Sequence, residues 1–216
     1  MRTWLAAVVW SLSAVALAAD PVGLPQEEKD QGFVSLFNGQ DLEGWQGDVK
    51  GYVVEQPGLL VCKPGGQLFT TKEYSDFVFR FEFKLEPNGN NGVGIRTPLG
   101  VNPAYGGMEI QILDDTGSQY TQLKPYQYHG SIYGVVPAKR GFLKPVGEWN
   151  SEEIRCEGTL VKVTLNGEVI VDADLSKVEP IDGNEHPGLK REKGYIGFLG
   201  HGSRIEFRNL RIKELK

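Results

Sequence analysis

Short runs of alternating apolar and polar residues, separated by turn-forming residues, recur along the chain. In residues 79–84, phenylalanine at every second position alternates with Arg80, Glu82 and Lys84. This period of two is typical of a half-buried β-strand. An Asn-Gly pair at residues 166–167 lies between two such runs and predicts a β-hairpin. Further strands are predicted over residues 92–97, 108–113, 153–156, 160–165, 168–171, 195–199 and 204–212.

The overall pattern predicts an all-β fold. No segment shows the long 3.6-residue apolar period of an amphipathic helix, and 28 glycines and 12 prolines provide frequent turns. Many short strands joined by turns are typical of a two-sheet antiparallel β-sandwich or a barrel. The length suits one domain, which we place at residues 32–215. Residues 20–31 are rich in Pro, Glu and Asp and are predicted to form a flexible leader.

The first residues have the pattern of a cleavable signal peptide, predicted over residues 1–19. Arg2 precedes an apolar run from Leu5 to Leu17, and Ala16-Leu17-Ala18 offers a small-x-small cleavage pattern. The run is shorter than the roughly 20 residues that span a bilayer, so a stable membrane anchor is the weaker interpretation. No cysteine stands directly after the predicted cleavage site, which disfavours a lipoprotein. The sequence therefore predicts a periplasmic or secreted protein.

Composition excludes some classes of function and leaves others open. The net charge of −5, without a basic stripe, argues against nucleic acid as a partner. Cys62 and Cys156 are the only cysteines. Export would permit a disulfide between them, and two separate buried thiols are the alternative. Two cysteines and three scattered histidines make a poor zinc site, and no cofactor is predicted.

Residues 117–147 differ from the rest of the chain because they are aromatic, basic and poorly periodic. They include His129, Tyr133 and Lys144. Long ordered loops in a compact domain are usually functional, so we expect this segment to lie over one face of a sheet near a site. The alternative is a loop that merely covers an edge strand.

The run from Tyr105 to Asp115 is the main candidate for chemistry. In a strand, Glu109 and Gln111 share one face, whereas the apolar residues between them point to the other. A bulge near Leu113 would turn Asp114 toward Glu109. The E-x-Q-x-x-D spacing is similar to the E-x-D-x-x-E signature of laminarinase-type glucanases, but a glutamine replaces the central carboxylate. A solvated strand face ending in an Asp-Asp turn is the alternative.

Arg96 is the candidate from the neighbouring strand. It shares a face with Gly92 and Gly94 in a regular strand, and such small residues leave room for a ligand above the sheet. Its five donors suit a carboxylate or sugar oxygens. A purely structural salt bridge between Arg96 and Glu109 is the alternative.

Two histidines are candidates for proton transfer near neutral pH. His201 lies between two glycines at a predicted hairpin, where its side chain can project freely. His129 begins a His-Gly-Ser-Ile-Tyr-Gly run inside the aromatic segment. An ordinary surface histidine is the alternative, and it is the interpretation that we adopt for His186.

An ordered set of motifs resembles the 3-keto-disaccharide hydrolase family, also described as 3-keto-glucoside 1,2-lyases and 3-keto-2-hydroxyglucal hydratases. The resemblance covers essentially the whole chain after the signal peptide and implies a concanavalin-like jelly roll. Each motif is weak alone, whereas the set in this order is highly specific. The matching runs are FNGQDLEGW at 37–45, TKEYSDF at 71–77, NG at 91–92 with IR at 95–96, residues 109–114, GSIYG at 130–134, GEWN at 147–150, LNG at 165–167, GHG at 200–202 and EFRNLRI at 206–212.

The resemblance implies a 3-keto-glycoside or related oligosaccharide as substrate. A carbonyl at C3 makes the C2 proton acidic, so a base can remove it, the aglycone at C1 can leave, and water can add back. This chemistry needs a base, an acid and groups that stabilise the enolate. We assign Glu109 as the base, Arg96 and His201 as clamps on the enolate or sugar oxygens, and Asp114 as a helper or acid. Substrate-binding residues are predicted to be Gln111, Asn91, His129, Tyr133 and Lys144.

Three alternatives to this interpretation stay open. A conventional glycoside hydrolase acting on unoxidised glycan is disfavoured by Gln111, because a retaining pair needs a second carboxylate. A non-catalytic sugar-binding module is compatible with the same fold. A divalent metal held by Glu109, Asp114 and His201 could replace the basic clamp, but no metal is predicted.

Overall fold

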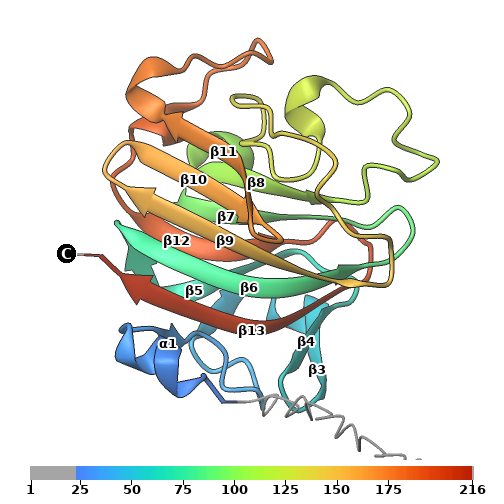
Figure 1. Cartoon of the computed structure of the whole chain (residues 1–216), viewed down its shortest axis with the longest axis vertical. Helices are drawn as coiled ribbons and strands as arrows, with labels where there is room; N and C mark the ends of the chain where they lie inside the picture. The colour runs from blue at the N-terminus through green and yellow to red at the C-terminus, as the bar shows by residue number, and fades with distance from the viewer. Residues whose placement is uncertain (1–22, 216) are drawn as a thin grey trace, which may run out of the picture.

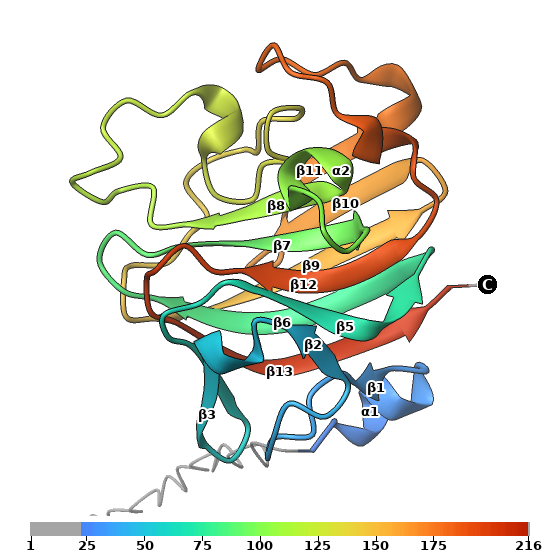
Figure 2. The same cartoon turned by 180° about the vertical axis from the view of Figure 1, so that it is seen from behind.

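The computed structural model describes residues 23–215, which form two antiparallel sheets packed face to face (Figures 1 and 2). The all-β, two-sheet sandwich predicted from the sequence is confirmed. The predicted signal peptide over residues 1–19 lies outside the described residues. Within residues 23–215, no helix has the length and apolar character needed to cross a bilayer.

The larger sheet has eight strands. They are β1 (Val34–Ser35), β3 (Tyr52–Gln56), β4 (Leu59–Cys62), β6 (Phe77–Leu85), β9 (Trp149–Glu157), β10 (Leu160–Leu165), β11 (Glu168–Asp174) and β13 (Ile205–Glu214). Their order is β11-β10-β9-β6-β13-β4-β3, and β1 also pairs with β13. This sheet faces the viewer in Figure 1.

The smaller sheet has five strands and faces the viewer in Figure 2. They are β2 (Trp45–Gly47), β5 (Gln67–Tyr74), β7 (Asn90–Thr97), β8 (Met108–Leu113) and β12 (Gly194–Leu199), in the order β2-β5-β12-β7-β8. Helical turns are short and lie in the connections. They are α1 (Gln26–Asp30), α2 (Pro103–Gly106), η1 (Val49–Gly51), η2 (Pro125–Gln127), η3 (Leu175–Lys177) and η4 (Pro187–Lys190).

The core lies between the two sheets and is aromatic. Every second residue of β6 from Phe77 to Phe83 is a fully buried phenylalanine, whereas the charged residues between them lie on the outer face. The Phe198 ring of β12 stacks on the Phe207 ring of β13, with centroids 4.0 Å apart. The alternation read from the sequence therefore places the apolar face of β6 against the opposite sheet. The predicted strands and the hairpin at residues 166–167 are confirmed.

One edge strand of each sheet is covered by residues 128–139, which we call the closing loop. Gly130 and Ser131 exchange backbone hydrogen bonds with Gln111 of β8, at 2.7 and 3.0 Å. The Lys139 amide donates to the carbonyl of Ile170 in β11, at 2.9 Å. This part of the predicted segment 117–147 therefore covers edge strands, as one interpretation of the sequence proposed, and it also contributes to the site described below.

Two further expectations are resolved by the described residues. Part of the predicted flexible leader, Gln26–Asp30, is helical, and its Glu28 accepts a hydrogen bond of 3.1 Å from Arg80 on β6. Cys62 and Cys156 are both buried free thiols in different strands. The alternative of two separate thiols therefore holds in this structure.

Candidate functional site

A polar cleft of about 250 Å³ lies over β8 on the outer face of the smaller sheet, and we call it the cleft. Its walls come from β8, from the segment before β8, from the loop after it, and from the turn between β12 and β13. The lining residues are Asn90, Asn102, Ala104, Tyr105, Glu109, Gln111, Leu113, Tyr120, Leu123, Gln127, Tyr133 and His201.

Glu109 lies at the base of the cleft because β8 alternates regularly. It pairs with Gly94, and Gln111 pairs with Gly92, so these four residues share the outer face. The missing side chain of Gly92 makes room for the carboxylate, since a Cβ there would lie 2.2 Å from Glu109 Oε1. Among residues 23–215, Glu109 Oε1 has no hydrogen-bond partner although it is buried. One carboxylate oxygen is thus left without a hydrogen bond from the described protein groups.

His201 reaches Glu109 from the turn between β12 and β13. Its Nε2 lies 3.8 Å from Glu109 Oε1, and about half of its side chain is exposed. The Glu109 carboxylate raises the pKa of His201 above its ordinary value, against the opposing effect of partial burial. The turn is fixed by a pair of backbone hydrogen bonds between Gly200 and Gly66, at 2.8 and 3.3 Å. The cleft therefore combines a carboxylate with an imidazole that is protonated more readily than usual.

Gln111 and Tyr133 complete the set of predicted residues that meet in the cleft. The Gln111 amide donates to Asn90 Oδ1 at 3.3 Å, and its Oε1 is buried with no partner among the described residues. Tyr133 is carried by the closing loop, whose backbone at this residue donates to the carbonyl of Glu109 at 2.9 Å. The Tyr133 hydroxyl accepts a hydrogen bond of 3.2 Å from Gln127. Both side chains offer polar groups to a sugar.

Tyr105 is a cleft residue to which the sequence analysis assigned no role. It belongs to α2, whose first turn is capped by Asn102, with Oδ1 accepting from the Ala104 amide at 3.0 Å. Burial raises the pKa of its phenol. A tyrosine four residues before Glu109 was the signal available in the sequence, but it could not show that the chain turns back over the cleft.

The prediction that Arg96 lies beside Glu109 is wrong. Between Gly94 and Thr97, β7 has one residue more than the facing stretch of β12, and Arg96 adopts a left-handed backbone with φ of 48°. This bulge breaks the alternation that would have aligned Arg96 with the glycines. The alternative of an Arg96–Glu109 salt bridge is equally excluded by this placement.

The guanidinium of Arg96 is buried and connects several turns of the chain. It donates to the carbonyls of Ser75, Gly158 and Arg191 at 2.8–3.2 Å, and to the Asp76 carboxylate at 3.0 Å. All of these partners are protein groups, so Arg96 contributes to structure and does not line the cleft.

Asp114 and Lys144 line a different hollow, of about 830 Å³. The bulge predicted near Leu113 is absent, because β8 stays in register with β7 through its last residue. Asp114 instead accepts hydrogen bonds from the Asn88 amide at 2.8 Å and from the Thr116 hydroxyl at 2.7 Å. Lys144 Nζ donates to a backbone carbonyl at 2.9 Å. The prediction that both residues meet Glu109 in one site is wrong.

Asn91 and His129 are buried beneath the surface and do not line the cleft. Asn91 Oδ1 accepts from the backbone amides of Gly92 and Leu199, at 2.8 and 2.9 Å. His129 Nδ1 accepts from the Leu113 amide at 3.3 Å, and its Nε2 lies 3.2 Å from the buried carboxylate of Glu152. Both residues were predicted to bind substrate, and this prediction is wrong. Each side chain faces the interior of the sandwich or the closing loop, where it makes contacts within the protein.

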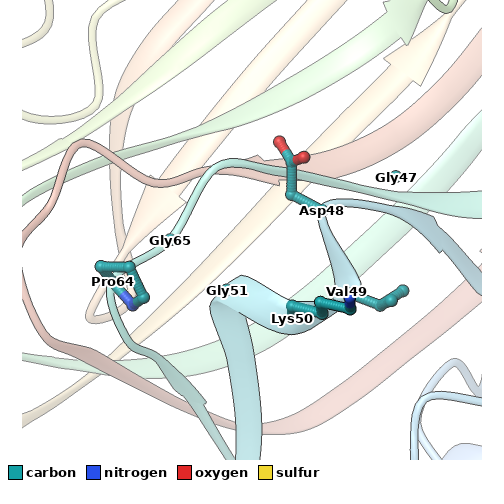
Figure 3. Close-up of a pocket in the computed structure, with 7 residues that line it drawn as sticks. All are labelled: Gly47, Asp48, Val49, Lys50, Gly51, Pro64 and Gly65. Atoms are coloured by element: carbon teal, nitrogen blue, oxygen red, sulfur yellow. The ribbon is translucent and has the colours of Figure 1, made fainter.

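Neither of two other features adds a candidate site. A hollow of about 380 Å³ lies beside η1 (Figure 3), but Asp48 Oδ2 there already accepts from the Gln67 amide at 2.7 Å. Within residues 23–215, no three His, Cys, Asp or Glu side chains lie close enough together to hold a metal ion. The metal ligand set considered from the sequence is not assembled, because Asp114 is outside the cleft.

Comparisons with solved structures support this fold. One Parabacteroides distasonis protein, provisionally named a glycosyl hydrolase, is 32% identical, with a TM-score of 0.73 over 85% of this chain and 99% of that one. A second from the same organism, named in the same way, is 27% identical, with a TM-score of 0.74 over 90% and 99%. A Bacillus subtilis protein with a galectin-like fold matches with a TM-score of 0.51 at 12% identity over 80% of this chain and 90% of that one, which shows the fold alone.

Sequence comparisons identify the family. A Bacteroides thetaiotaomicron protein named 3-keto-disaccharide hydrolase is 26% identical over 258 residues, covering 97% of this chain and 87% of that protein. Residues 32–213, nearly all of the described chain, match the family described as the 3-keto-alpha-glucoside-1,2-lyase-like domain. This match agrees with the resemblance read from the ordered motifs. The chain therefore belongs to the 3-keto-alpha-glucoside-1,2-lyase-like family.

Proposed function

We propose that this protein is a carbohydrate-active enzyme that cleaves the glycosidic bond of 3-keto-glycosides. The observation that carries the proposal is that Glu109 lines a polar cleft, with no hydrogen-bond partner for its Oε1 among the described residues and with His201 Nε2 3.8 Å from that oxygen. The name of the Bacteroides relative supports the substrate class. The signal peptide predicted over residues 1–19 supports action outside the cytoplasm, which we also propose.

The chemistry proposed for the cleft is elimination followed by hydration. Glu109 removes the C2 proton of the 3-keto sugar, and the C–H electron pair forms the C2–C3 double bond of an enolate whose negative charge lies on the C3 oxygen. The enolate then collapses to the C3 ketone, its electron pair forms a C1–C2 double bond, the C1–O bond breaks, and His201 as imidazolium gives its proton to the leaving oxygen. Water adds across the new double bond, so that the net reaction is hydrolysis. Base and acid must reach neighbouring positions of the sugar, C2 and the oxygen on C1, and two side chains 3.8 Å apart can serve neighbouring positions.

Neutral donors would stabilise the enolate in this scheme. Tyr105, Tyr133 and Gln111 line the cleft and carry hydroxyl or amide hydrogens. They take over the function first assigned to Arg96, and His201 takes over the acid role first considered for Asp114. This reassignment follows from which side chains share the cleft.

A conventional glycosidase is the weaker proposal. A retaining mechanism needs two carboxyl groups about 5 Å apart, and an inverting one needs two about 6.5–9.5 Å apart. Glu109 is the one carboxylate among the residues that the structure describes as lining the cleft. A single carboxylate with a histidine suits proton abstraction next to a carbonyl better than displacement at C1.

The test is turnover of a 3-keto-glucoside and of the parent glucoside by purified protein. We expect sugar release from the oxidised substrate alone, and a loss of at least about 10³-fold in Glu109→Gln, because the base is removed while the shape is kept. Glu168→Gln, at an exposed position on β11, is the control and should retain wild-type turnover. Equal turnover by Glu109→Gln and wild type would exclude Glu109 as the base. Release from the parent glucoside would favour a conventional hydrolase, and binding without release would favour a sugar-binding module.

A further inference from the structure

A buried Asp–His pair lies directly behind the wall of the cleft, in the connection between β11 and β12. His186 Nε2 is 3.1 Å from each carboxylate oxygen of Asp182, and the two side chains are 2% and 3% exposed. Burial alone would raise the pKa of Asp182, but hydrogen bonds from Asn184 and His186 outweigh it and lower that pKa. The expectation that His186 is an ordinary surface residue is therefore wrong.

The pair touches the cleft through Tyr105. The His186 and Tyr105 rings meet edge to face, with centroids 4.9 Å apart and planes inclined by 67°. On its other side the pair packs against Gly134, the residue after Tyr133. A Cβ at Gly134 would lie 2.6 Å from Asp182 Oδ2 and 2.6 Å from His186 Cε1. The buried pair therefore contacts Tyr105 directly and Tyr133 through the neighbouring residue Gly134.

The connection between β11 and β12 also contacts the backbone at the end of α2. Arg191 Nε donates to the Gly106 carbonyl at 2.7 Å, and the Arg191 carbonyl accepts from Arg96 at 3.1 Å. Gly188 approaches so closely that a Cβ there would lie 1.8 Å from the Gly107 carbonyl oxygen. The backbone on the C-terminal side of Tyr105 is thus fixed by these contacts, and the ring of Tyr105 is fixed by His186.

We propose that His186, oriented by Asp182, is a positioning residue that sets the Tyr105 phenol for contact with the substrate. The inference rests on the proposed function, because it treats Tyr105 as a donor to the substrate. Neither His186 nor Asp182 lines the cleft, so both act through Tyr105. A side chain held on a rigid support loses less freedom when it orients a ligand, and small displacements of such a group cost rate. A purely structural role for the pair would instead stabilise the fold with no specific link to Tyr105.

A double-mutant cycle between His186→Ala and Tyr105→Ala separates these two roles. We expect His186→Ala to lower kcat on a 3-keto-glucoside about tenfold in the wild-type background and less than twofold in the Tyr105→Ala background. Equal losses in both backgrounds would overturn the proposal. Asp182→Asn provides the same cycle if His186→Ala does not fold. Glu185→Ala, an exposed neighbour in the same connection, is the control and should leave kcat unchanged.

A second measurement does not depend on activity. In protein labelled with ¹³C-tyrosine, His186→Ala should shift the ring resonances of Tyr105 and leave those of Tyr120, another cleft tyrosine, unchanged. If wild-type protein lacks turnover, the proposed function fails, and the Tyr105 resonances still test the contact between His186 and Tyr105 on which the positioning role depends. Unchanged Tyr105 resonances would overturn the positioning role even if turnover is present.

Discussion

Gly92 should control the position of the Glu109 carboxylate, and replacing it with alanine would move that group without removing it. A Cβ at Gly92 would lie 2.2 Å from Glu109 Oε1, 2.7 Å from Cγ and 2.8 Å from Cδ. Ordinary contact at a Cβ begins at 3.4 Å, so the carboxylate oxygen must move by about 1 Å. Gly92 is not among the glycines with positive φ, so its backbone accepts alanine.

The magnitude follows from the precision that proton abstraction requires. A misplacement of about 1 Å costs about 10²-fold in rate, equivalent to roughly 2.7 kcal/mol of transition-state stabilisation. The free energy of unfolding should change by less, about 1 kcal/mol, because the crowded atoms belong to a side chain that can swing toward the cleft. The Gly92→Ala variant should therefore lose much of its activity and little of its stability.

The assay is kcat/KM on a 3-keto-glucoside, measured together with thermal unfolding. Gly94→Ala is the control on the same face of β7. The three atoms nearest to a Cβ there would be Thr97 Oγ1 at 3.0 Å, Leu199 Cδ2 at 3.4 Å and Phe69 Cε1 at 3.5 Å, so no Glu109 atom would lie as close as 3.4 Å. We expect Gly92→Ala to lose about 10²-fold and Gly94→Ala to stay close to wild type. Similar rates in the two variants would refute the argument that Gly92 makes room for the base.

Three further predictions concern the surroundings of the cleft. Asn91→Leu leaves two buried backbone amides without an acceptor, so the free energy of unfolding in urea should fall by about 2–4 kcal/mol; a fall below about 1 kcal/mol would contradict this. In Glu109→Gln the pKa of His201, followed by NMR, should fall toward its ordinary value. Because that pKa is raised in the folded state, the stability it contributes is present below the unfolded pKa of about 6.5 and is lost as pH rises through the folded pKa; an unchanged His201 titration would contradict the coupling. Cys62 and Cys156 should both react with a thiol reagent after denaturation and neither in the native protein, since both are buried and burial raises the pKa of Cys156 to about 12; no reaction after denaturation would indicate a disulfide.

The sequence predicted the fold and the central strand of the site because both follow from local alternation. In β8, three buried apolar residues alternate with Glu109 and Gln111, and the pattern alone fixes which side chains face outward. His201 was found because a histidine between glycines in a turn can project freely. These features need only a regular strand and a turn.

The failed predictions for Arg96, Asp114 and His186 depended on where a strand is irregular or on which loops meet. A bulge was expected beside Asp114 and occurs instead at Arg96. Nothing near either residue in the sequence marks the position of the extra residue, because it is set by pairing with a distant strand. His186 contacts Tyr105 across 81 positions of sequence, so no local pattern could reveal the pair. The ordered motifs identified the family without locating these contacts.

The closing loop has a consequence for solubility as well as for the site. An unpaired edge strand is a template on which another chain can add, and long exposed edges promote aggregation. By bonding to Gln111 on β8 and to Ile170 on β11, a single segment occupies backbone groups on an edge of both sheets. Cleavage within the exposed stretch before this loop would release that protection, so proteolytic damage near residue 121 should promote self-association through the strands.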